Sequence, residues 1–283
     1  FAMVLDNMAP LIKTDSWSFP EAEKLGKQNL TIIRSLAASN PAAFRPILAA
    51  TLNSLASFYG DYLFWNEAVT TYEESLGIIR ELAAANPAAY RPALASTLRN
   101  LARLYALTWK TTESKNAYQE ALTIFRELVT VRPAVYKPVV ASVLNGLARA
   151  HLGTKEQREA ENNFLESIAL YRELVAASPT IYQPALADTL LNFVMFVAHP
   201  DLTAQELRYA EEAVEIYRKL WLENSDRYAS QFSYALVVLT FVVSRSKDAT
   251  PTACRLAREV EIVTQHNKVI QDSVGNLLRR ACH

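Results

Sequence analysis

The sequence contains little glycine and almost no cysteine. Only 6 of its 283 residues are glycine, and none lies in a glycine-rich loop before a helix, so no phosphate-binding loop is predicted. The two cysteines could form at most one disulfide, which excludes the dense disulfide framework of a small secreted protein. The low glycine content, together with 51% hydrophobic residues, suits a helical fold.

An excess of charge of one sign and a long apolar run are also missing. The 29 lysine and arginine residues balance 29 aspartate and glutamate residues, so no net charge attracts nucleic acid or a membrane surface. The longest apolar run, from Tyr234 to Val243 and broken by Thr240, is too short to span a bilayer, and no charged leader precedes an apolar stretch. We therefore expect a cytoplasmic protein that binds neither nucleic acid nor a membrane.

Residues that could carry catalysis or hold a metal ion are scattered along the chain. The metal-binding residue types that lie nearest one another have spacings that match no zinc pattern; they are Cys254, His266, Cys282 and His283. No strand is evident that could present a nucleophile. We therefore predict no enzymatic activity, no metal site and no cofactor.

A repeat of 46 residues organises the sequence. One aromatic position returns at this spacing as Phe44, Tyr90, Tyr136, Tyr182 and Tyr228. The leucine eight residues further on returns as Leu52, Leu98, Leu144, Leu190 and Leu236. A fixed period of this size is typical of stacked units that each depend on their neighbours to bury an apolar face.

Each unit is predicted to hold two amphipathic helices, because apolar residues recur at helical spacing from Leu94 to Tyr105 and from Ala117 to Leu128. Asn86 followed by Pro87 is typical of a helix start. Since a proline inside a helix removes a hydrogen bond, we expect a short turn at 87–91 and the main helix beginning near Pro92.

The packing positions of this unit resemble those of the tetratricopeptide repeat, at Leu98, Leu101, Ala102, Tyr105, Ser114, Tyr118 and Ala121. The segments TLNSLASFY and TLRNLARLY are most similar to the kinesin-light-chain type. This resemblance implies an all-α fold, a right-handed superhelical solenoid. The usual repeat has about 34 residues, so we place about 12 extra residues in a longer second helix and in the NPxxYxP connector.

The repeat period divides the predicted solenoid into seven segments. They are a partial first repeat with a long loop at 1–39, repeats at 40–85, 86–131 and 132–177, degenerate repeats at 178–224 and 225–268, and a C-terminal capping segment at 269–283. Residue 1 corresponds to the middle of a first helix, which suggests a fragment of a larger multidomain protein. An arginine recurs at one position of the second helices and is predicted to join neighbouring repeats; it appears as Arg34, Arg80, Arg126, Arg172 and Arg218.

The resemblance implies a protein–protein interaction scaffold that binds a peptide or partner protein in a concave groove lined by the first helices. The groove residues expected are Arg99, Asn100, Arg103, Asn145, Arg149 and Asn192. An acidic ligand is predicted, because 86–112 and 132–155 contain basic residues and no aspartate or glutamate. The alternative is a sensor or oligomerisation region of a signalling protein, next to a nucleotide-binding switch or protease-like effector, without a free peptide ligand.

The asparagine position of the groove is interrupted, because Ser54, Gly146 and Val238 stand where Asn100 and Asn192 lie in other repeats. Towards the C-terminus the predicted groove becomes apolar, with a patch formed by Met195, Tyr234, Val238 and Phe241. We expect the segment 269–278 to cover this patch. A partner protein or a second copy of the chain, giving a homo-oligomer through the C-terminal repeats, remains the alternative cover.

Overall fold

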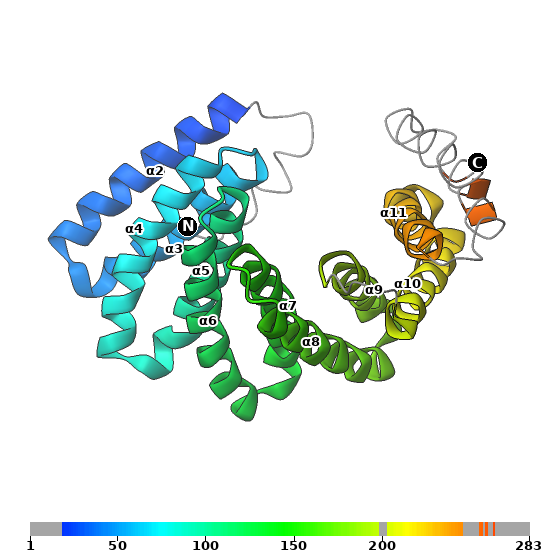
Figure 1. Cartoon of the computed structure of the whole chain (residues 1–283). Coiled ribbons are helices and arrows are strands. Elements are labelled where there is room, and N and C mark those ends of the chain that lie inside the picture. The colour runs from blue at the N-terminus through cyan, green and yellow to red at the C-terminus, as the bar shows by residue number, and fades with distance from the viewer. Residues whose placement is uncertain (1–18, 198–202, 246–254, 257, 260–262, 264–283) are drawn as a thin grey trace. The chain divides into compact units, whose positions relative to one another are not determined.

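The computed structural model describes residues 19–197, 203–245, 255–256, 258–259 and 263. All regular structure within these residues is helical, which confirms the predicted all-α fold (Figure 1). The chain forms two compact units, Phe1–Thr154 and Lys155–His283. The first unit contains α2 (Phe19–Ser39), α3 (Pro41–Asp61), α4 (Trp65–Ala85), α5 (Pro87–Leu107), α6 (Thr111–Val131) and α7 (Pro133–Gly153). The second contains α8 (Gln157–Ala177), α9 (Pro179–Phe196), α10 (Ala204–Glu223) and α11 (Ser225–Ser244).

Within each unit, every described helix packs against the next one along the chain. The helices approach closely because small residues stand at their crossing points, and Ala56, Ala102 and Ala148 are fully buried. Leucines such as Leu52 and Leu98, also fully buried, fill the space between the helices. The core is therefore a continuous layer between first and second helices, as expected for repeats that bury their apolar faces against one another.

The prolines lie inside helices, which corrects the prediction of a short turn at 87–91. Helix α5 begins at Pro87 and continues through Pro92 without interruption, and α3, α7 and α9 contain a proline at the same place. Pro92 removes only the bond to the carbonyl of residue 88. The Asn86 side chain accepts a hydrogen bond from the Ala89 amide at 3.3 Å and secures this first turn.

The extra length of the repeat consequently lies in both helices rather than in a connector. The first and second helices of the regular repeats each have 21 residues, and the NPxxYxP segment forms the first two turns of the first helix. The two helices of a pair are joined by a tight turn with a residue at positive φ, which is Leu63 (65°) after α3 and Trp109 (62°) after α5. Only a single residue, such as Asn86, separates one pair from the next.

The recurring arginine joins neighbouring repeats, as predicted, at four of its positions. Ion pairs connect Arg34 to Glu74 at 2.6 Å, Arg80 to Glu120 at 2.5 Å, Arg172 to Glu212 at 2.7 Å, and Arg218 to Glu259. These side chains are well exposed, so each pair contributes at most about 1 kcal/mol. The row therefore aligns the second helices more than it stabilises them. His151, in the last turn of α7, is also buried, with 6% of its surface exposed.

Some predicted features lie outside the described residues: the partial first helix and long loop before Phe19, the segment 269–283, and the group Cys254, His266, Cys282 and His283. None of the described helices combines the length and the apolar character that crossing a bilayer requires.

We predict that two substitutions at the residue before a first helix, made in different repeats, change the free energy of unfolding in opposite directions. Asn86→Ala should lower the free energy of unfolding by about 1 kcal/mol, because the Ala89 amide loses its acceptor. Arg132 occupies the equivalent position before α7 with similar backbone angles and no side-chain cap bond. Arg132→Asn should therefore raise the free energy of unfolding by about 0.5 kcal/mol or more. Urea denaturation followed by circular dichroism checks both changes, and equal stability of Asn86→Ala and the native chain would contradict the capping role.

Candidate functional site

A polar pocket lies where α5 and α7 face each other in the first unit. It has a volume of about 300 Å³ and is lined by Arg99, Asn100, Arg103, Tyr118 and Ser142. The three α5 residues fall within one helical turn, so they project to the same side of the helix. Arg103 is exposed, whereas Arg99 and Asn100 are half-buried. The structure thus brings together three of the residues predicted from the sequence.

Tyr118 reaches this pocket from the second helix α6, through a space that Gly146 leaves open. A Cβ atom at position 146 would lie 2.5 Å from Cζ of the Tyr118 ring, closer than any side chain tolerates. Tyr118 is itself buried, with 7% of its surface exposed. The sequence identified Tyr118 only as a packing residue. The signal for its second role was Gly146, which interrupts the asparagine position.

Asn100 is held on the tyrosine of the preceding repeat. Its Nδ2 atom donates to Oη of Tyr72 at 3.4 Å, and Arg99 donates to its Oδ1 atom at 3.3 Å. Both bonds are long and therefore weak. Burial raises the pKa of the Tyr72 hydroxyl, which stays neutral. Asn100 is thus positioned by the repeat and retains amide groups that a ligand can engage.

The electrostatic character of the pocket is positive. Burial raises the pKa of the Tyr118 hydroxyl, while the charges of Arg149, Arg103 and Arg99 act in the opposite direction. No acidic side chain lines the pocket. Among the described residues, Arg103 makes no ion pair, whereas Arg91 of the same helix pairs with Glu127 at 2.6 Å and is turned to another side.

The remaining predicted residues are distributed between the two units. Asn145 is half-buried and Arg149 exposed in α7, whereas Asn192 is half-buried in α9 and so belongs to the second unit. In the apolar patch, three side chains are exposed, at 39% for Met195, 44% for Tyr234 and 47% for Phe241. Val238 is only 1% exposed and lies beneath the surface.

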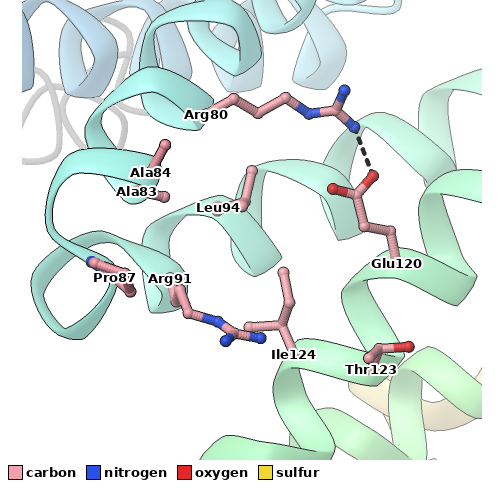
Figure 2. Close-up of a pocket in the computed structure, with 9 residues that line it drawn as sticks. All are labelled: Arg80, Ala83, Ala84, Pro87, Arg91, Leu94, Glu120, Thr123 and Ile124. Carbon is pink, nitrogen blue, oxygen red and sulfur yellow. Dashed lines mark hydrogen bonds and ion pairs between the residues drawn. The ribbon is translucent and has the colours of Figure 1, made fainter.

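A second pocket of about 450 Å³ lies between α4, the start of α5, and α6 (Figure 2). Its lining is mostly apolar; it consists of Arg80, Ala83, Ala84, Pro87, Arg91, Leu94, Glu120, Thr123 and Ile124. Both arginines are already paired, one with Glu120 inside the pocket, as Figure 2 shows, and the other with Glu127. Since its charges are neutralised, this pocket offers less to orient a polar ligand than the pocket at Tyr118.

Comparison with known proteins supports the helical-repeat architecture. Residues 94–129 and 140–179 match the family model of the tetratricopeptide repeat. The crystal structure of BtubC (BKLC) from P. vanneervenii is similar, with a TM-score of 0.65, 18% identity, and coverage of 86% of this chain and 89% of that one. A P. anserina structure described as a kinesin light chain with nearly identical TPR-like repeats has a TM-score of 0.49 and 18% identity, and covers 94% of this chain and 96% of that one. No curated protein matches the sequence at a significant level.

We predict that two glycine-to-alanine substitutions change the free energy of unfolding in opposite directions. Gly146→Ala should lower the free energy of unfolding by about 1 to 3 kcal/mol, because the new methyl group displaces the Tyr118 ring. Gly77→Ala is the matched control, because position 77 lies inside α4 with no atom within 4 Å of the added Cβ. It should raise stability by about 0.5 to 1 kcal/mol through helix propensity. Thermal denaturation measures both, and a stable Gly146→Ala variant with an unchanged tyrosine fluorescence would show that the ring is not confined.

Proposed function

We propose that this chain, an array of tetratricopeptide repeats, is a protein-binding module, and that the face of α5 and α7 holds an acidic segment of its partner. The observation that carries the proposal is the pocket at Tyr118, where the side chains of Arg99 and Arg103 meet without an acidic residue in the lining. The repeats are predicted to act in the cytoplasm, and the partner is expected in the same compartment.

The arginines of this face differ from those of the second helices. Arg34 and Arg80 are engaged by glutamates of neighbouring repeats, so their charge is satisfied within the protein. Arg103 is exposed and makes no ion pair among the described residues. Its guanidinium group can bind a carboxylate through two parallel hydrogen bonds. Charge is therefore available on the face of α5 and α7, where a ligand can reach it.

The neighbouring groups fit a peptide rather than a small anion alone. Asn100 and Asn145, both half-buried, present amide groups to a backbone that has a donor and an acceptor at nearly every residue. Tyr118, which is largely buried, adds an aromatic side chain with a polar hydroxyl to the lining of the pocket. The expected ligand is thus an extended segment with an acidic side chain placed at Tyr118. Asn192 at the equivalent position of α9 offers the same kind of backbone contact in the second unit.

The test is charge reversal on this face. Arg103→Glu combined with Arg149→Glu should weaken the binding of a fluorescein-labelled octaglutamate peptide by at least about tenfold, because two charged contacts are lost and repulsion replaces them. Fluorescence anisotropy with the full chain measures the dissociation constant. The affinity of the native chain for octaglutamate should also fall steeply as the salt concentration is raised from about 50 to about 300 mM, because salt screens the attraction between opposite charges.

Lys24→Glu combined with Arg132→Glu is the control, because it changes the net charge equally at two exposed residues away from the pocket. It should leave octaglutamate binding within about twofold of the native value, since distant exposed charges are screened. If both double variants lose binding alike, the effect comes from net charge and the pocket has no specific role. If neither loses binding, the proposed function is wrong.

A further inference from the structure

We propose that the pocket between α4, the start of α5, and α6 binds an aromatic side chain of a protein partner. Its volume of about 450 Å³ lies within the range of pockets that hold organic groups. It shares no lining residue with the pocket at Tyr118. The first unit therefore has a second place where a partner can be held, and its chemistry differs from that of the first.

The floor of this pocket is apolar, and residues at its edge are accessible. Ala83, Leu94 and Ile124 line the pocket and are buried, at 6%, 9% and 5% exposure. Ala84 and Pro87, which also line it, are exposed. An apolar group that enters past these exposed residues removes carbon atoms on both sides from water, which favours its binding.

Two arginine side chains border the pocket and are held there by glutamates. Figure 2 shows Arg80 and Arg91 on opposite sides of Leu94. Arg80 pairs with Glu120 at 2.5 Å, and Arg91 pairs with Glu127 at 2.6 Å. A guanidinium group bound to a carboxylate along its edge keeps its flat face for stacking on an aromatic ring. Because the arginine charges are neutralised, the pocket favours an uncharged ring over an anion.

The last repeat carries aromatic rings of the chain itself at two of the corresponding positions. Trp221 stands three repeat periods after Ala83, and Phe232 stands three periods after Leu94. The centroids of these two rings lie 5.5 Å apart, and Phe232 is only 1% exposed. Positions that line a pocket in the first unit thus hold packed aromatic rings in the second unit.

An arginine lies over one of these rings. Arg218 stands three repeat periods after Arg80, and its guanidinium carbon lies 5.3 Å from the centroid of the Phe232 ring. The same guanidinium forms an ion pair with Glu259. Ion pairing and stacking therefore occur together at this position of the repeat. In the first unit Arg80 has the ion pair and Leu94 stands in place of the ring, so a partner's ring would complete the arrangement.

A protein supplies the ring in this proposal, because an apolar floor within a polar rim is typical of a protein–protein interface. The rim here consists of the two ion pairs and the exposed Thr123. Tryptophan, tyrosine and phenylalanine are enriched at the centres of such interfaces. This site does not rest on the acidic ligand proposed for the face of α5 and α7, so either proposal can fail alone.

The experiment measures the binding of N-acetyltryptophanamide to the full chain by saturation-transfer NMR. This probe carries an indole ring between two peptide groups, as in a protein, and N-acetylleucinamide is the aliphatic comparison. The native chain should bind the tryptophan probe about fivefold more tightly than the leucine probe, because only a ring can stack on a guanidinium group. Equal affinities would show that the pocket takes any apolar group, and the proposal would be wrong.

Ala84→Trp tests the location of the site. Because Ala84 is exposed and lines the pocket, an indole ring attached there can fill the pocket from outside the core. It should weaken binding of the tryptophan probe at least about tenfold, since the space is then occupied. Ala85→Trp is the matched control, because Ala85 is the next residue, is exposed and does not line the pocket. It should bind the probe within about twofold of the native chain. The proposal is overturned if the two variants bind the probe equally.

Arg80→Lys tests the stacking. Lysine keeps a positive charge for Glu120 but has no flat face, so affinity for the tryptophan probe should fall about two- to fivefold while affinity for the leucine probe stays unchanged. An unchanged affinity for the tryptophan probe would contradict the role of Arg80.

Two further results would identify another occupant and overturn the proposal. Tighter binding of free tryptophan than of N-acetyltryptophanamide would indicate a metabolite site. A native dimer that Ala84→Trp converts to a monomer, measured by analytical ultracentrifugation, would show that a second copy of the chain fills the pocket. Ala84→Trp should leave octaglutamate binding unchanged, which separates this test from that of the pocket at Tyr118.

Discussion

The fold depends on close contact between helices that cannot bury their apolar faces alone. Ala49, Ala95 and Ala141 are completely buried at one repeated position, and each lets the backbone of a first helix approach its neighbours. Leucines one turn further along fill the remaining space. Because every described helix packs against the next within each unit, removing volume at any of these positions would loosen the neighbouring helices. The positions of the candidate binding residues depend on this packing.

The same packing decides which side chains reach the proposed binding face. Tyr72 and Tyr118 are second-helix residues; the Tyr72 hydroxyl accepts a hydrogen bond from Asn100 of α5, and Tyr118 lines the pocket beside α5. Gly146 is needed because the Tyr118 ring occupies the place of a Cβ atom there. A glycine inside a helix costs about 0.5 to 1 kcal/mol relative to alanine, so the ring is accommodated at the expense of helix stability. The pocket is therefore formed by the core as much as by the surface.

Charge is separated between the two kinds of helix. On the second helices, the arginine of one repeat forms an ion pair with a glutamate of the next repeat, as Arg34 does with Glu74. On the first helix α5, Arg103 has no ion-pair partner among the described residues. Exposed ion pairs contribute little to stability, so the paired row aligns the second helices more than it stabilises them. The unpaired charge thus lies on the proposed binding face.

The sequence alone determined the repeat period, the helical class, the tetratricopeptide-repeat family resemblance and the row of arginines that joins repeats. These features follow from a spacing of 46 residues that recurs along the chain. Because several copies show the same pattern, a departure in one copy does not hide it. It also identified Arg99, Asn100 and Arg103, because residues within one turn of a helix share a face.

Only the tertiary structure decided which of these side chains are open to a ligand. Helix α5 continues through Pro92, because its cap and its packing outweigh the loss of one hydrogen bond. Arg91 forms an ion pair with Glu127, Val238 is buried, and Tyr118 lines the pocket. Each of these outcomes depends on a neighbour in another helix, at a distance that no local spacing in the sequence specifies. Periodicity gives the face of a helix, whereas contact with the next helix determines what that face exposes.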